Sequence, residues 1–256
     1  LMLQRCFSPD EVMRSHPEWQ VKRGPGSWNY ALPEVQEYQV KKFAWIMENH
    51  DLEGFIVDFT RYGHHFNQDE PDKFGHMNAF LRKVRAATDA INAKKDRKLA
   101  LCASFGDRSW HLTHWGTGKL EDQGIDVQTW LDEGLFDVIM PEGPNALDYV
   151  AMAEGTSTEV WPRFVSRVDI ETHTKLDGHD SPKEIERGIH WAYEQGAPGI
   201  FLFNYEPWTT LARIGYPEEL AERVKTDVVY GLHEGPMVEF ARSEERRVGK
   251  ECIVKC

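Results

Sequence analysis

The chain has 256 residues, a formal net charge of −12 and 41% hydrophobic residues, enough for one large α/β domain or two small ones. The negative charge argues against sequence-independent binding to phosphate backbones, so nucleic acid is not an expected partner. No apolar run in the sequence is long enough to span a bilayer. A neutral substrate such as a sugar is compatible with this composition.

The end of the chain differs from the rest. Residues 242–256 resemble the translation of a short-read sequencing adapter, and we expect them to be an assembly artefact. Without this tail only Cys6 and Cys102 remain, too few for a disulfide framework, so the cellular compartment stays open. The expected domain therefore covers residues 1–241.

The first predicted elements are a helix and a strand. Pro33 suits the first turn of a helix. The apolar side chains of this helix share one broad face: Val35, Tyr38, Phe43, Trp45 and Ile46. The run Phe55-Ile-Val57 lacks polar alternation, which is typical of a strand buried on both faces in a parallel sheet, and it ends in Asp58.

Helices and strands continue to alternate along the middle of the chain. A long helix carries a stripe at i, i+4, i+7 and i+11: Phe80, Val84, Ala87 and Ile91. A strand is predicted over 99–103. Asp126 can cap a short helix over 127–131, and the next strand, 136–140, ends at Pro141-Glu142-Gly143. We expect Glu142 to lie in a tight turn, followed by a short helix over 147–151.

The last third repeats the pattern. A less regular strand over 161–168 contains Pro162. Ser181-Pro-Lys-Glu184 is a capping box that begins a helix with Ile185, Ile189 and Ala192 on its inner face and a stop near Gly196. A fifth strand, 199–203, precedes a final helix with Leu220, Val224 and Val228.

Five strand–helix units predict an α/β fold with a parallel sheet. Polar residues follow several separate strands, and no Gly-x-Gly-x-x-Gly follows any of them. This favours a (β/α)8 TIM barrel over a Rossmann-type sheet. Because a closed barrel has eight strands, we expect a partial barrel in which about three N-terminal units are missing, with Leu1 to Gln4 as the remnant of one.

Several segments together carry a family resemblance. Pro33-Glu-Val-Gln-Glu-Tyr38 followed by Leu52-Glu-Gly-Phe-Ile-Val-Asp-Phe-Thr-Arg-Tyr62 resembles the signature of the glycosyl hydrolase-like 10 domain family, although Glu53 replaces its usual Asp. Similar segments are His16 to Trp19, Gly124 to Trp130, Glu133 to Asp137 and Gly199 to Tyr205. The resemblance implies a TIM barrel related to glycoside hydrolases of the α-galactosidase and α-amylase kind. A strand-four Asp is the nucleophile there, so Asp58 would end strand four and the chain would hold strands 4 to 8.

Glycoside cleavage needs two carboxyl groups that flank the scissile bond. Three acids follow predicted strands, namely Asp58, Glu142 and Glu206. We predict Asp58 as the nucleophile or ionised stabiliser, because a neighbouring Arg61 favours a charged carboxylate. Glu142 is the predicted acid/base, although Asp107 would displace it if Asp107 matched the acid/base position of amylase-like barrels.

Sugar rings pack their C–H faces on aromatic side chains, and aromatic residues follow several strands. Trp115 is one of them. The other predicted substrate-binding residues are Arg61, Tyr62, His64, His65, Asp107, Trp110, Asn204, Tyr205, Glu206 and Trp208.

Two alternatives remain open. In one, the barrel binds carbohydrate without cleaving it. In the other, His64, His65, His111 and His114 hold a divalent metal in a metal-dependent hydrolase on the same fold. The favoured prediction is a glycoside hydrolase that needs no cofactor or metal.

Overall fold

The computed structural model describes residues 11–22, 27–60, 64–95, 98–106, 119–142, 146–165, 182–203 and 214–226. The chain divides into two units, Leu1–Trp161 and Pro162–Cys256, each with its own sheet and hydrophobic core. No helix within these ranges is both long and apolar enough to cross a membrane.

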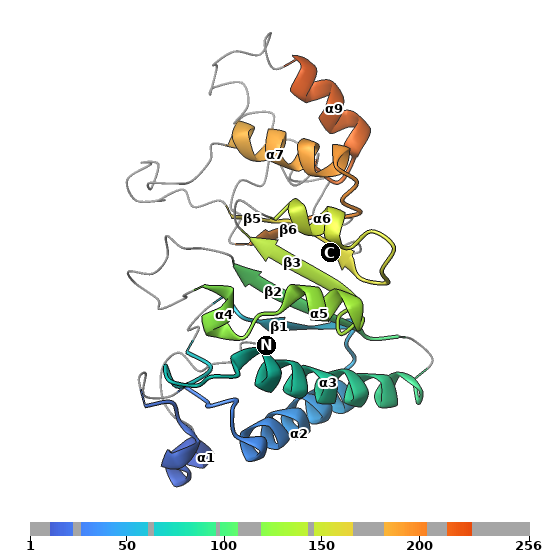
Figure 1. The fold of residues 1–256 in the computed structure, drawn as a ribbon. Helices are drawn as coiled ribbons and strands as arrows, with labels where there is room; N and C mark the ends of the chain where they lie inside the picture. Colours follow the sequence, from blue (N-terminus) through green and yellow to red (C-terminus); the bar gives the residue numbers. More distant parts are fainter. Residues whose placement is uncertain are drawn as a thin grey trace. The chain divides into compact units, whose positions relative to one another are not determined.

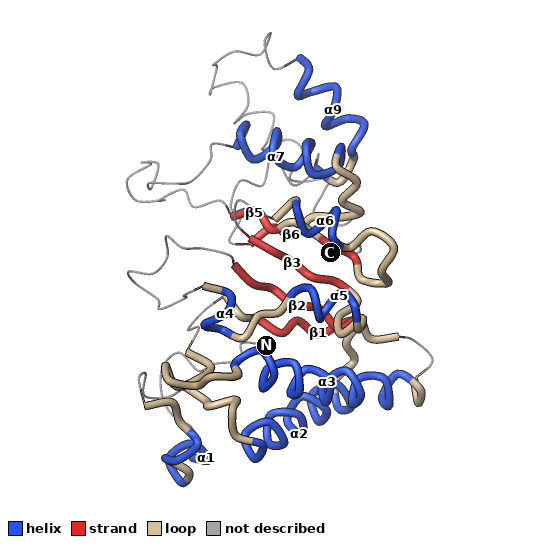
Figure 2. Tube along the Cα trace, viewed as in Figure 1, coloured by secondary structure: helices blue, strands red, loops and turns tan. Residues whose placement is uncertain are grey.

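The first unit alternates strands with helices (Figures 1 and 2). Its elements are α1 (Glu11–Ser15), the 3-10 helix η1 (Pro17–Trp19), α2 (Pro33–Asn49), β1 (Gly54–Asp58), α3 (Lys73–Asn92), β2 (Ala100–Gly106), α4 (Leu120–Gln123), α5 (Val127–Asp132), β3 (Val138–Glu142), α6 (Asp148–Met152) and β4 (Glu159–Val160).

Strands β1 to β4 form one sheet in chain order, and every neighbouring pair is parallel. Helix α3 connects β1 to β2, α4 and α5 connect β2 to β3, and α6 connects β3 to β4. This succession of β–α–β connections confirms the predicted α/β class and is consistent with part of a (β/α)8 barrel.

The strand register separates the residues of the sheet into two faces. One face packs against the helices and supplies the core with Phe55, Val57, Leu101, Ala103 and Ile139. The alternate residues share the opposite face: Ile56, Asp58, Cys102, Ser104, Gly106, Val138, Met140 and Glu142. In a closed barrel this second face would be the interior.

Helices α2 and α3 pack side by side against the core face (Figure 1). Helix α2 buries Val35, Phe43 and Met47, whereas Trp45 is 59% exposed, so its predicted place on the inner face is wrong. The reason is helical geometry: Phe43 and Met47 are four residues apart and share a face, and Trp45 lies two residues from each. In α3 the predicted stripe is confirmed, except that Thr88 is buried where Ala87 was expected.

Two strands differ from their predicted limits. Strand β3 continues through Pro141 to Glu142, which pair in register with Phe105 and Gly106, so Glu142 ends a strand and the expected tight turn is wrong. The strand predicted over 161–168 is replaced by two short strands on either side of Trp161-Pro162. Proline lacks the amide hydrogen that a strand ladder needs, which explains the interruption.

The second unit contains β5 (Arg163–Val165), α7 (Pro182–Glu194), β6 (Phe201–Phe203) and α9 (Pro217–Thr226). Strands β5 and β6 are parallel. Ile189 of α7 packs with Ile214 and with Leu220 of α9 in a small core. Helix α7 stops before Gly196, whose φ of 89° suits the left-handed residue that ends many helices. The predicted helices are thus confirmed; the side chains of Ile185 and Val228 lie outside the described residues.

Candidate active site

Asp58 and Glu142 lie on one face of the same sheet, at the C-terminal ends of its strands. Each is the last residue of its strand, and β1 and β3 run parallel on either side of β2. Asp58 pairs in register with Ser104 and Ser104 with Met140, two residues before Glu142. Because side chains alternate along a strand, all four point to the face away from α2 and α3. The sheet therefore brings these two predicted catalytic carboxylates to a common edge.

Their spacing follows from sheet geometry. Two strand-to-strand steps separate β1 from β3 by about 10 Å, and the two-residue offset adds about 7 Å along the strand. The Cα atoms are then roughly 12 Å apart, with both side chains on the same face. Carboxyl groups that cleave glycosides are about 5 to 9.5 Å apart, a separation that an aspartate and a longer glutamate can reach from such positions.

The carboxylate of Asp58 is held by the residue two places further on. Its Oδ1 accepts a hydrogen bond from the backbone N–H of Thr60 at 2.9 Å and another from the Thr60 hydroxyl at 2.5 Å. Among the described residues, none donates to Oδ2. One oxygen of Asp58 is thus tied to the backbone after β1, and the other has no protein donor there.

Residues of β2 lie between the two acids. Ser104 is buried beside Asp58, and Gly106 stands opposite Glu142 on the same face. Since Gly106 has no side chain, β2 places no side chain directly beside Glu142 on this face. The sequence prediction missed Thr60, Ser104 and Gly106. The signal for the last two was that Cys102, Ser104 and Gly106 follow one another at two-residue intervals, which assigns them to the same face of a strand.

The structure places His65 in the core, which corrects its expected contact with a sugar. The side chain is fully buried, and its ring packs edge-on against Tyr30 and Phe59 at centroid distances of 5.9 and 5.8 Å. Burial, with a smaller contribution from the charge of His64, lowers the pKa of His65 from 6.5 to about 3. His65 is therefore a neutral packing residue at ordinary pH, while His64 is partly exposed.

The other predicted site residues lie outside the described residues. They are Arg61, Tyr62, Asp107, Trp110, Asn204, Tyr205, Glu206 and Trp208, together with Trp115, His111 and His114. The expected ion pair of Arg61 with Asp58 and the alternative acid Asp107 therefore stay predictions.

No group of three or more potential metal ligands gathers within the described part of the chain. His65, one of the four histidines of the metal alternative, is enclosed by aromatic rings in the core.

At the N-terminal ends of the strands, Asp137 is a carboxylate with a structural role. Asp137, which precedes β3, accepts hydrogen bonds from Arg85 at 2.9 Å, from Lys98 at 2.5 Å and from the N–H of Leu101 at 2.8 Å. Partial burial alone would raise the pKa of Asp137, but these donors together hold it below its usual value. Asp137 joins α3, β2 and β3, whereas the hydrogen bonds to the Asp58 carboxylate within the described residues come from Thr60.

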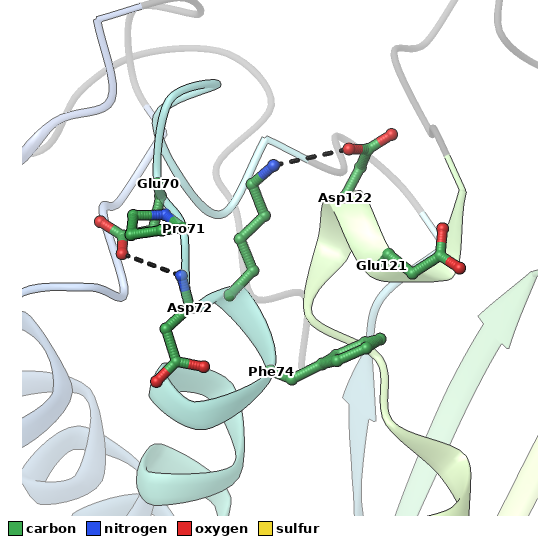
Figure 3. A pocket seen from close by; sticks show the side chains of 7 residues that line it. Glu70, Pro71, Asp72, Phe74, Glu121 and Asp122 are labelled. Carbon is green, nitrogen blue, oxygen red and sulfur yellow. Dashed lines mark hydrogen bonds and ion pairs between the residues drawn. The ribbon is translucent and has the colours of Figure 1, made fainter.

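A shallow pocket of about 210 Å³ lies where α3 and α4 begin (Figure 3). Its wall contains Glu70, Asp72, Glu121 and Asp122, and Lys73 reaches Asp122 at 3.5 Å. Asp72 also caps α3 by accepting the N–H of Gly75 at 2.9 Å. None of the predicted catalytic residues lines this pocket, so it is distinct from the Asp58–Glu142 edge.

Comparisons with known proteins find one distant sequence similarity. No family model matches the chain. Over 205 residues it is 23% identical to the protein named glycosyl hydrolase YngK of Bacillus subtilis (strain 168), across 69% of this chain and 40% of that protein. The chain thus spans well under half the length of this curated relative.

A structural comparison finds a glycoside hydrolase family 18 N-acetylglucosaminidase from Paenibacillus barengoltzii, with a TM-score of 0.47 and 11% identity, covering 76% of this chain and 80% of that one. This likeness is too remote to inform the fold or the site. Neither comparison names the glycosyl hydrolase-like 10 family, so that assignment stays a prediction.

Proposed function

We propose that this chain is part of a carbohydrate-active hydrolase of the glycosyl hydrolase-like 10 kind, a partial TIM barrel that cleaves a glycosidic bond with Asp58 and Glu142. The observation that carries the proposal is their shared position: both end parallel strands on the same face, with β2 between them. Carboxylates at the C-terminal edge of such strands are where TIM-barrel enzymes build their catalytic sites. The sequence relative, a named glycosyl hydrolase, supports the same class.

Each acid has a role in this reaction. Asp58, oriented by Thr60, attacks the anomeric carbon as nucleophile or acts as the base that activates water. Its Oδ2 is the reacting oxygen. Glu142, which ends β3 two residues beyond the residue level with Asp58, protonates the leaving oxygen. The substrate is a carbohydrate that lies over Ser104 and Gly106, and the predicted aromatic residues that follow the strands would pack on its rings.

The proposal is tested by turnover of a panel of 4-nitrophenyl glycosides. We expect the wild type to release nitrophenol from at least one of them. Asp58→Asn should lower kcat by about 10⁴-fold or more, and Glu142→Gln by about 10²- to 10⁴-fold, because each removes a group that takes part in the transition state. The anomeric configuration of the product then distinguishes a nucleophile from a base at Asp58.

Glu159→Gln is the matched control. Glu159 begins β4 at the other edge of the same sheet, and a glutamine can still accept the 2.9 Å bond from Trp161 Nε1. Its turnover should equal that of the wild type. Full activity of Asp58→Asn would refute the proposed role of Asp58.

A further inference from the structure

Thr60 makes the only contacts that fix the Asp58 carboxylate within the described residues. Both of its donors, the backbone N–H at 2.9 Å and the hydroxyl at 2.5 Å, converge on Oδ1. The hydroxyl bond lies at the short end of the range for a hydroxyl that donates to a carboxylate. The position is partly buried, so bulk water competes less for these bonds than at an exposed site.

Two donors on one oxygen make the two carboxylate oxygens of Asp58 unequal. Oδ1 is engaged on the side of the turn, which fixes the rotation about the last side-chain bond. Oδ2 then has a set direction, while Asp58 itself points away from the helices, on the face that it shares with Ser104 and Glu142. An acid that attacks carbon or water needs one oxygen held at a fixed angle to its target.

We propose that Thr60 is a positioning residue for the reaction: its hydroxyl holds Asp58 so that Oδ2 faces the reacting sugar carbon or water. This inference rests on the proposed function. It also gives the hydroxyl at position 60 a role. Any residue except proline could supply the backbone N–H, but serine or threonine adds a hydroxyl two residues after the acid.

Two variants separate the hydroxyl from the shape of the side chain. Thr60→Val keeps the branched shape and the backbone N–H and removes the hydroxyl, whereas Thr60→Ser keeps the hydroxyl. With a 4-nitrophenyl glycoside that the wild type cleaves, we expect Thr60→Val to lower kcat about 10- to 100-fold while KM changes less than about threefold. Thr60→Ser should stay within about threefold of the wild type in both constants.

Thr88→Val is the control for loss of a hydroxyl in the same unit. The Thr88 hydroxyl donates to the Val84 carbonyl inside α3 at 2.9 Å, away from the acids, so kcat should not change. A merely structural role of Thr60 would lower thermal stability and leave kcat of the folded enzyme intact. Unchanged kcat in Thr60→Val, or a loss in Thr60→Ser as large as in Thr60→Val, would overturn the inference.

A crystal structure of Thr60→Val distinguishes failure of this inference from failure of the proposed function. If the wild type cleaves no glycoside but the Asp58 side chain turns away in Thr60→Val, the positioning contact stands and the hydrolase proposal fails. If Asp58 keeps its orientation without the hydroxyl, the positioning role is excluded, whether or not the protein cleaves glycosides.

Discussion

Burial decides the role of single polar residues in this protein. His65 follows the strand that carries Asp58 by only a few positions, yet it lies in the core against Tyr30 and Phe59. Its backbone carbonyl also accepts the N–H of Tyr30 at 2.9 Å. A histidine in such a place stabilises the fold only while it is neutral, because a charged imidazolium in an apolar core has no compensating solvation.

The lowered pKa of His65, about 3 against 6.5 for the free side chain, makes stability depend on pH. The unfolded chain binds the proton at a higher pH than the folded one, so the contribution is complete above about pH 6.5 and is lost as pH falls toward 3. Where this group alone titrates, the free energy of unfolding should fall by about 1.4 kcal/mol per pH unit. Urea unfolding of the wild type and His65→Phe at pH 7, 6 and 5 measures this.

We expect the phenyl ring of His65→Phe to fill the site and to reduce this slope. His50→Gln is a suitable control, because His50 is exposed after α2 and should leave the slope unchanged. Equal slopes in the wild type and His65→Phe would mean that His65 remains solvated in the folded state.

At the scale of elements, short helices depend on contacts beyond their own length. Helix α5 has only six residues, too few to be stable alone. Its N-cap Asp126 accepts hydrogen bonds from the N–H of Thr129 at 3.3 Å, from its hydroxyl at 2.6 Å and from Asn78 of α3 at 2.9 Å. Asn78 in turn accepts the indole N–H of Trp130 at 3.0 Å. One chain of hydrogen bonds thus joins the start of α5 to α3 and to the buried Trp130.

Asp126→Ala should therefore destabilise the protein by about 1 to 3 kcal/mol, because it removes the cap and leaves a bond of Asn78 unmade. Denaturant unfolding at neutral pH measures the loss. Asp132→Ala at the other end of α5 is the control: it removes one exposed bond from Gln128 and should cost less than about 0.5 kcal/mol. Equal losses in the two variants would contradict the role assigned to the cap.

At the scale of the whole molecule, local patterns predicted the α/β class, the positions of four strands and the main helices, whereas the strand expected over 161–168 is two short strands. The 3.6-residue stripe of α3 and the proline start of α2 are signals that a few neighbouring residues contain. Residues whose position depends on strand register were harder to predict. That Ser104 lies beside Asp58 and Gly106 beside Glu142 follows only from the alignment of β2 with β1 and β3. Trp45 was misplaced because it lies two residues from both Phe43 and Met47, off the face that they share. His65 was misplaced because a loop has no periodic pattern that shows which side chains face the core.

The same limit applies to the candidate site. The place of Asp58 at a strand end could be predicted from an apolar run that ends in an acid, but the face that it shares with Glu142 requires the parallel order of β1, β2 and β3. The role of Thr60 depends on a turn whose hydrogen bonds no residue pattern specifies. The predicted aromatic and polar residues of the sugar site lie outside the described residues, and their roles stay predictions.

The most direct test is a crystal structure of the Asp58→Asn variant with the glycoside that the wild type cleaves. We predict that the glycosidic bond lies over Ser104 and Gly106, between position 58 and Glu142, with the two carboxyl positions about 5 to 9.5 Å apart. A sugar bound at the N-terminal edge of the strands or on the helix-covered face, or carboxyl positions well beyond 10 Å apart, would contradict the account.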